Sequence, residues 1–286
     1  MERVIDIHAH PISRDLVRDP RNLRAMERHA ACLGTGNAVD RLLQRMEAGE
    51  IAVSCLMGPA PGDGIALTNE MVRDVVAKCP DRLFGFVGVD PIRDGAEATR
   101  ALVERAVREW GFRGVGELAN IDLLDTRCEA LYRTCIELDV PLLLHVGIPL
   151  PSMLLRHGHP FALDEVANRY PDLKIIAAHA GVPWIAETIA IAVRHTNVSI
   201  DLSALPAFDP RAVEVVLSWC LREGLADRVL FGSDFPVVDP AAYADRLRRF
   251  QPGWVLRRLS RAPRISGEVR AGLLGGNAAR LLKIDR

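Results

Sequence analysis

Eight short apolar segments, each followed by a helical pattern, constrain the fold of this chain more than any other feature. They lie at residues 4–10, 51–57, 83–89, 112–118, 141–147, 173–181, 198–202 and 229–234. Nearly continuous apolar strands that alternate with helices are typical of a parallel sheet covered by helices. Eight such units in 286 residues match the usual size of a (β/α)8 barrel. We therefore predict an α/β fold, with residues 1–286 forming a single TIM barrel domain.

An open, doubly wound sheet is the alternative to the closed barrel. That fold would place a glycine-rich phosphate turn after the first strand, whereas residues 8–11 read His-Ala-His-Pro. No linker rich in glycine and serine marks a second domain. The segment 13–36 is long, polar and rich in arginine, and the segment 148–160 is also long. Long segments between a strand and its helix are often functional, so we predict that residues 13–36 form a lid or a substrate loop.

Composition limits the classes of partner. The formal net charge is −1 and no block of like charges stands apart, so nucleic acid and an anionic membrane surface are not predicted partners. No apolar run approaches the ~18 residues of a membrane span, and a strand that begins at Val4 leaves no room for a signal peptide. The six cysteines form no Cys-x-x-Cys pair. We expect a cytoplasmic protein with reduced thiols and a small-molecule substrate.

Polar side chains occur where the predicted strands end. In a (β/α)8 barrel the carboxyl ends of all strands face one mouth, where active sites form. The candidates there are His8, His10, Glu117, His145, His179 and Asp234. His8 and His10 share a face of their strand because side chains alternate along it. Imidazoles together with one or two carboxylates suit zinc, while iron, manganese and cobalt stay open. The sequence therefore predicts a site for a divalent metal, with zinc the favoured ion.

Four motifs carry a family resemblance. They are Asp-Ile-His-Ala-His-Pro at 6–11, Leu-His-Val-Gly at 144–147, Ala-His-Ala-Gly at 178–181 and Phe-Gly-Ser-Asp-Phe-Pro at 231–236. In this order they resemble the amidohydrolase-related branch of the amidohydrolase superfamily, which includes aminocarboxymuconate semialdehyde decarboxylase. Residues 276–282, Gly-Asn-Ala-Ala-Arg-Leu-Leu, are similar to the closing helix of that branch. The resemblance implies a metal-dependent enzyme on a barrel, and it makes a homodimer an expectation.

The resemblance also implies roles for the residues at the strand ends. By it, His8, His10, His145 and Asp234 hold the metal, and His179 serves as the acid or base or polarises the substrate. Glu117 has two interpretations. In relatives with two metals, an acidic residue at the end of the fourth strand bridges the ions, and in one-metal decarboxylases this role is absent. We therefore retain two alternatives for Glu117. It is either a ligand of one or two ions, or a polar residue of the barrel mouth paired with an arginine.

Hydrolysis is our first interpretation of the function. Metal-activated water would attack a carboxylic ester, lactone or amide of a small molecule. Asp234 would take the proton of the water, and His179 would polarise the carbonyl group or donate to the leaving group. One alternative is a non-oxidative decarboxylase on the same scaffold. A second alternative is a non-catalytic barrel that binds a metabolite.

Other polar residues are weaker candidates. Asp6 could orient a metal ligand or make a contact at the strand end. Asp201 with Ser203 could contact substrate or form a structural hydrogen bond. His157 and His159 could bind substrate from their loop, but we favour their interpretation as exposed loop residues. His29 and His195 lie in polar settings and are interpreted as surface residues.

Overall fold

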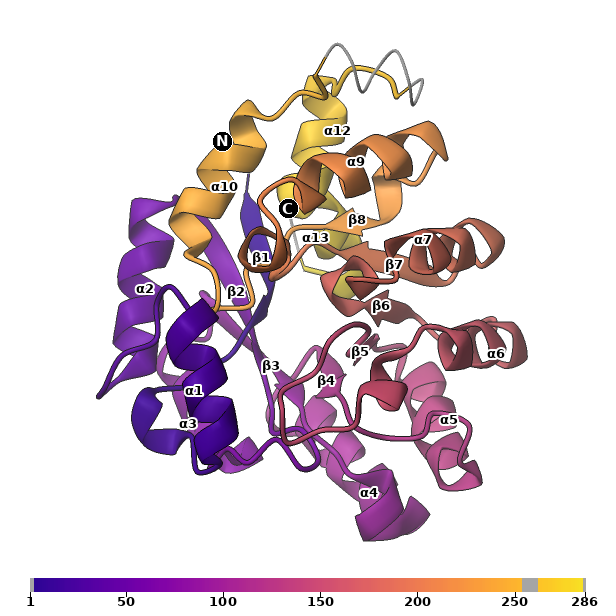
Figure 1. Ribbon diagram of the computed structural model, residues 1–286. Coiled ribbons are helices and arrows are strands. Elements are labelled where there is room, and N and C mark those ends of the chain that lie inside the picture. Colours follow the sequence, from indigo (N-terminus) through magenta and orange to yellow (C-terminus); the bar gives the residue numbers. More distant parts are fainter. Residues whose placement is uncertain (1–2, 254–261, 285–286) are drawn as a thin grey trace.

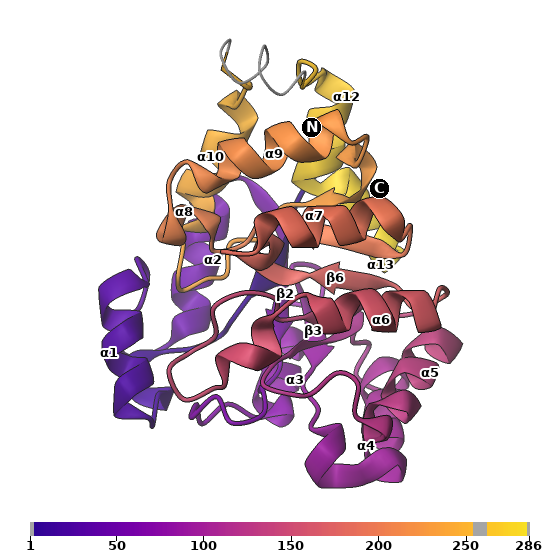
Figure 2. The same ribbon diagram turned by 45° about the vertical axis from the view of Figure 1, so that its right-hand side comes forward.

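The computed structural model describes residues 3–253 and 262–284 and contains a sheet of eight parallel strands. The strands are β1 (Val4–Ala9), β2 (Ile51–Met57), β3 (Leu83–Val87), β4 (Gly114–Leu118), β5 (Leu142–Leu144), β6 (Ile175–Ala177), β7 (Val198–Asp201) and β8 (Val229–Leu230). Each strand pairs in parallel with the next one along the chain. Figures 1 and 2 show the helices arranged outside these strands.

Hydrogen bonds between the two ends of the sheet close it into a barrel. The backbone N–H of Asp234 donates to the carbonyl oxygen of His8 at 2.7 Å, and the N–H of His10 donates to that of Phe235 at 2.7 Å. Beneath them, the buried carboxylate of Asp6 accepts hydrogen bonds from the backbone N–H and the hydroxyl group of Ser233, at 2.8 and 2.7 Å. The predicted (β/α)8 barrel is therefore confirmed, and Asp6 serves as a contact between strand ends.

The helices cover the sheet, and several of them begin at side-chain caps. They are α1 (Pro20–His29), α2 (Ala38–Ala48), α3 (Asn69–Lys78), α4 (Pro91–Arg108), α5 (Glu129–Leu138), α6 (Phe161–Arg169), α7 (Ile185–Arg194), α8 (Leu205–Phe208), α9 (Ala212–Arg222), α10 (Pro240–Arg249), α12 (Gly267–Ala271) and α13 (Asn277–Leu282). The hydroxyl group of Thr68 accepts from the backbone N–H of Met71 at 3.2 Å and caps α3. Asp19, Asn37, Asp90 and Asp239 cap four further helices in the same way.

The apolar side chains form two main buried clusters. The larger cluster packs the helices against the sheet. The second contains Ile5, Val53, Leu143, Ile176 and Leu230, which come from five different strands. Because these strands lie on different sides of the barrel, this second cluster fills its interior. None of the helices in the described ranges is long and apolar enough to cross a membrane.

The segment 13–36 differs from the loop predicted for it, because its middle forms helix α1. Asp19 caps this helix and Pro20 occupies its first position, both of which favour a helix start. Its polar, arginine-rich composition hid the helical pattern. Strands β6 and β8 are also shorter than predicted. The chain leaves the sheet early there, and the backbone φ angles of His179 and Asp234 are 58° and 59°. The closing helix α13 is separated from α12 by an irregular turn at Gly272–Gly276.

Candidate metal centre

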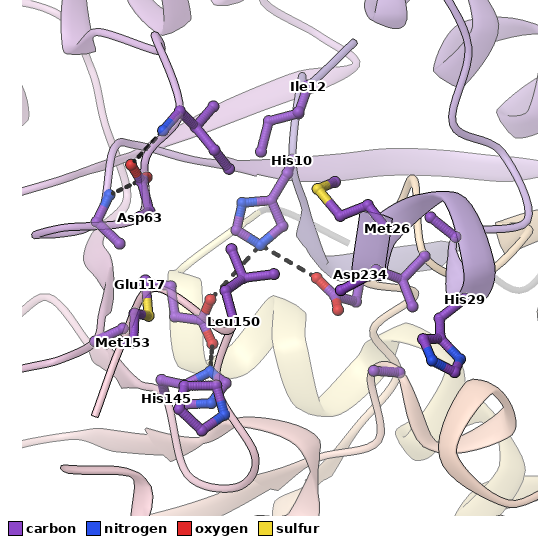
Figure 3. A pocket seen from close by; sticks show the side chains of 18 of the residues that line it. His10, Ile12, Met26, His29, Asp63, Glu117, His145, Leu150, Met153 and Asp234 are labelled. Atoms are coloured by element: carbon purple, nitrogen blue, oxygen red, sulfur yellow. Dashed lines mark hydrogen bonds and ion pairs between the residues drawn. The ribbon is translucent and has the colours of Figure 1, made fainter. Parts of the chain in front are cut away.

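A cavity of about 430 Å³ lies at the barrel mouth (Figure 3). Its polar floor is formed by residues from the strand ends, namely His10, Glu117, His145, His179 and Asp234. Its wall is mostly apolar and comes largely from α1 and the segment 148–160, with Met26, Leu150 and Met153 among its residues. Two carboxylates and three imidazoles therefore meet at one end of an otherwise apolar pocket.

Four side chains converge within the floor. The Nε2 atoms of His8 and His10 lie 3.0 Å apart. Oε2 of Glu117 lies 3.7 and 3.6 Å from these two atoms, and Oδ1 of Asp234 lies 3.7 and 3.2 Å from them. The donor atoms around a tetrahedral ion with bonds of about 2.0–2.2 Å are separated by roughly 3.3–3.6 Å. The spacing of His8, His10 and Glu117 thus suits a cation, and Asp234 lies at a similar distance from the same two histidines.

The orientation of the His8 ring is set by Asp201, which contacts the ring nitrogen that faces away from the cavity. Its Nδ1 atom lies 2.8 Å from Oδ2 of Asp201, and both side chains are fully buried. A carboxylate only accepts hydrogen bonds, so Nδ1 carries a hydrogen atom and Nε2 faces His10 and Glu117. Burial alone would lower the pKa of His8, but the charge of Glu117 and the contact with Asp201 outweigh burial and raise that pKa well above its usual value.

Glu117 faces histidines on two sides. Its Oε1 atom lies 2.9 Å from Nδ1 of His145 and 3.2 Å from Nε2 of His179, while Oε2 faces His8 and His10. Burial raises the pKa of Glu117, but His145 and His8 outweigh burial and hold it well below its usual value. The glutamate is therefore a carboxylate shared by two groups of histidines, and the arginine partner considered for it from sequence does not match these contacts.

The pKa of Asp234 is also lowered. Burial opposes ionisation of this carboxyl group, but the hydrogen bond with His10 and the charges of His179 and His8 lower the pKa below its usual value. Both acids of the floor are thus ionised at neutral pH, as metal binding requires.

The donor atoms of the floor are suited to a divalent ion, and the buried Nε2 atom of His145 supports this. The Nε2 atom of His145 is buried and has no hydrogen-bond partner within the described ranges. A buried polar atom without a partner calls for an explanation, and a bound ion is one of those known. At His145 the neighbouring carboxylate and histidines are consistent with an ion. The imidazole and carboxylate donors suit zinc, manganese, iron or cobalt. Three combinations of residues bring possible ligand atoms together within the described ranges: His8, His10 and Glu117; Glu117, His145 and His179; and His8, His179 and Asp201.

All six residues predicted from the strand ends lie in this cluster, but in two groups. His8, His10 and Asp234 lie on one side of Glu117. His145 and His179 lie on its other side, with their ring centroids 5.0 Å apart. The resemblance instead implies that His145 shares one ion with His8, His10 and Asp234. The structure thus adds Glu117 to that first group and places His145 beside His179.

Several weaker candidates also find their places. Asp201 and Ser203 are fully buried behind the floor and hydrogen-bond to each other, so the structural interpretation fits them. His159 packs on Trp184, with ring centroids 4.7 Å apart, outside the residues that line the cavity. His29 is exposed, in agreement with its interpretation as a surface residue, and it also lines the cavity from α1. Sequence reasoning missed this place in the cavity because α1 itself was missed; the Asp-Pro start at residues 19–20 was the available signal.

Solved structures resemble this barrel over its whole length. An uncharacterized TIM-barrel protein from Bordetella bronchiseptica matches with a TM-score of 0.76 and 22% identity, covering 98% of each chain. The 5-carboxyvanillate decarboxylase of Sphingomonas paucimobilis matches with a TM-score of 0.64 and 19% identity, covering 100% of each chain. A dihydroxybenzoic acid decarboxylase from Polaromonas sp. JS666, solved with manganese and 2-nitroresorcinol, matches with a TM-score of 0.65 and 20% identity, covering 100% of this chain and 98% of the other. At these levels of identity the likeness shows the fold.

Membership of a family rests on the sequence itself. The family model described as amidohydrolase matches residues 5–284, nearly the whole chain. This range includes every motif on which the resemblance rests, from the paired histidines of β1 to the closing helix α13. The chain belongs to the amidohydrolase family of enzymes.

Proposed function

We propose that this protein is a metal-dependent enzyme that decarboxylates a small, largely apolar carboxylic acid without an oxidant. The observation that carries the proposal is the form of the cavity, in which carboxylates and imidazoles occupy the floor and apolar side chains form most of the wall. No lysine or arginine side chain lines the cavity in the described part of the chain. A substrate carboxylate would therefore find its favourable partners at the floor, with its apolar body against the wall.

The similar structures favour decarboxylation over the hydrolysis that we inferred first. Two of the three solved structures described above are decarboxylases of aromatic carboxylic acids, and one of these contains manganese. We therefore propose a divalent ion as the cofactor, with manganese tested beside zinc. His8, His10, Asp234 and Glu117 would hold it, and His145 would complete the site or support a second ion, which leaves His179 free of the metal.

The roles of the residues follow from their positions. A bound divalent ion supplies Lewis-acid polarisation of substrate oxygens and acidifies water. Decarboxylation breaks the bond between the carboxyl group and its carbon, and that carbon must receive a proton as carbon dioxide leaves. His179 lies at the floor with Nε2 beside Glu117, and we assign it the delivery of this proton. The apolar wall excludes water and favours loss of a charged group as neutral gas.

Hydrolysis of an ester, lactone or amide is the second candidate, and one observation favours it. Asp234 and Glu117 both have lowered pKa values, so two carboxylate bases border the floor. A base is needed to take a proton from attacking water, whereas decarboxylation needs an acid.

Isotopic water separates these reactions. Protein reconstituted with zinc or manganese would be incubated with hydroxylated aromatic carboxylates and with a panel of lactones, esters and amides. Release of carbon dioxide, with deuterium from D2O at the vacated carbon, supports decarboxylation. Incorporation of ¹⁸O from labelled water into a carboxylate product supports hydrolysis instead. Metal-stripped protein is the control, and the absence of both products at every metal would leave only the non-catalytic binding interpretation.

A further inference from the structure

A network of buried hydrogen bonds lies behind the floor and is not used by the reaction as described so far. Asp201 ends β7, Ser203 follows it, and both are fully buried. The hydroxyl oxygen of Ser203 lies against Oδ2 of Asp201, 2.9 Å from Nδ1 of His179 and 3.2 Å from Nδ1 of His8. One hydroxyl group thus touches an acid and two of the histidines of the floor.

Counting hydrogen atoms fixes the direction of each bond. The carboxylate of Asp201 only accepts, and its Oδ2 atom takes one hydrogen from Nδ1 of His8 and another from the hydroxyl group of Ser203. Since a serine hydroxyl group has one hydrogen, its oxygen can only accept from His179. The Nδ1 atom of His179 must therefore carry a hydrogen in both protonation states of the ring. The Nε2 atom, which lies 3.2 Å from Oε1 of Glu117, is then the atom that gains and loses a proton.

We propose that Ser203 is a positioning residue which fixes the tautomer and the ring orientation of His179, so that Nε2 faces the floor and exchanges protons with substrate. The inference rests on the proposed function for its catalytic consequence, but the tautomer itself does not depend on turnover. Asp201 thereby orders two histidines at once, His8 directly and His179 through Ser203.

Close packing from β8 holds this network in place. A Cβ atom added at Gly232 would lie 2.2 Å from Oδ1 of Asp201 and 3.1 Å from Cβ of Ser203. The backbone N–H of Ser203 donates to the same Oδ1 atom at 2.9 Å. The carboxylate of Asp201 is therefore packed between the end of β7 and the residues that follow β8. A side chain at position 232 would overlap this carboxylate, which explains why glycine precedes Ser233 and Asp234.

The arrangement differs from a nucleophilic serine triad. In such a triad the acid contacts the imidazole and the serine hydroxyl group faces substrate. Here Asp201 contacts the hydroxyl group of Ser203 itself, and Ser203 is fully buried. Ser203 therefore cannot reach a substrate in the cavity and cannot act as a nucleophile. It can, however, orient the neighbouring imidazole of His179.

The test compares Ser203→Ala with Ser218→Ala. Ser218 is also buried, and its hydroxyl group has no hydrogen-bond partner within the described ranges, so its loss should leave the site unchanged. In zinc-loaded protein labelled with ¹⁵N-histidine, the ring-nitrogen shifts report the tautomer, and His179→Gln assigns the signal. We expect Ser203→Ala to remove the fixed hydrogen on Nδ1 of His179, so that the neutral ring becomes a mixture of tautomers, and to lower kcat by about 10- to 100-fold, as loss of outer partners typically does. KM and zinc content should stay close to those of the Ser218→Ala control.

Ser203→Thr keeps the hydroxyl group and should restore both the tautomer signal and most of kcat. An unchanged His179 tautomer in Ser203→Ala would overturn the inference, as would a kcat within twofold of the wild type. Loss of zinc in parallel with kcat would also overturn it, because Ser203 would then act through a metal ligand. If no panel substrate reacts with the wild type, the proposed function fails, while the nuclear magnetic resonance comparison still decides the role of Ser203.

Discussion

Glu117 connects the two halves of the floor, because one carboxylate oxygen faces His8 and His10 and the other faces His145 and His179. Its charge is therefore the common partner of four imidazoles. His8 and His179 also stack on each other, with ring centroids 5.2 Å apart, so the two groups adjoin directly as well.

Neutralising that charge should weaken metal binding. Glu117→Gln keeps the shape of the side chain but removes the negative charge. We therefore expect at least about a tenfold loss of metal affinity, which is the typical effect of replacing a residue that supports a metal ligand. Titration calorimetry with zinc and manganese measures it. The exposed Glu165→Gln variant is the matched control, and equal affinities in both variants would remove Glu117 from the site.

His145 and Asp234 test the two sides of Glu117 separately. His145→Ala and Asp234→Ala should each abolish metal-dependent turnover while the protein stays folded and soluble, because each removes a donor from the floor. Product formation and circular dichroism measure the two properties. Unchanged turnover in either variant would exclude that residue from the mechanism.

Metal binding should release protons near neutral pH. Burial opposes charge on His8 and His179, but Glu117 outweighs it and raises the pKa of both rings in the metal-free protein. A ring with a raised pKa stays protonated above the usual imidazole range, and a metal needs the neutral ring. Affinity should therefore rise as pH increases through the raised pKa values. Calorimetry in buffers of different ionisation enthalpy measures the release, and binding heats that are independent of the buffer would contradict it.

At the scale of elements, one buried side chain ties three segments over the cavity. Nδ2 of Asn22 in α1 donates to the carbonyl oxygen of Asp63 at 2.6 Å and to the hydroxyl group of Ser152 at 2.8 Å. Its Oδ1 atom accepts from the backbone N–H of Ser152 at 3.0 Å. Asn22 thus joins α1 to the segments that follow β2 and β5.

Asn22→Ala should loosen this cover and leave the barrel intact. Three hydrogen bonds are lost and buried partners are left unpaired, which costs about 1–3 kcal/mol for each unsatisfied group. We expect faster hydrogen exchange in α1 and around Ser152, with exchange in β1 and β7 unchanged. Asn37→Ala removes only the cap of α2 and is the control. Equal exchange in α1 for both variants would show that Asn22 does not hold the cover.

The sequence predicted some elements and not others for physical reasons. The strands were predictable because burial on both faces gives nearly continuous apolar runs, and the barrel then brings their terminal histidines and acids together. The early ends of β6 and β8 were not, since Ala178 and Phe231 are as apolar as the strands they follow. The contacts of Ser203 and His29 depend on how the segments after β7 and β1 fold back, which local periodicity does not encode.

At the scale of the whole molecule, the metal site joins distant parts of the chain. Its residues come from β1, β4 and the segments after β5, β6 and β8, so a bound ion links most of the barrel. Binding to the folded state alone stabilises a protein by mass action. The ion should therefore act on global stability as well as on chemistry.

Removal of metal should lower the thermal midpoint. Free metal at 100 times its Kd adds about 2.7 kcal/mol to the free energy of unfolding, which corresponds to several degrees in Tm for a chain of this size. Differential scanning calorimetry with zinc and with a chelator measures the shift. Asp234→Ala should show a smaller shift than the wild type, and identical midpoints for the wild type with and without zinc would contradict metal binding.

The two parts of the cavity have different structural supports. The strand ends carry the reactive groups, and barrel closure fixes them. The wall comes largely from α1 and residues 148–160, which are excursions from the barrel. Substitutions at Met26 or Leu150 should therefore change substrate selectivity and leave the reactive groups at the strand ends in place. A library of variants confined to α1 and residues 148–160 offers a route to new substrates with the same catalytic residues.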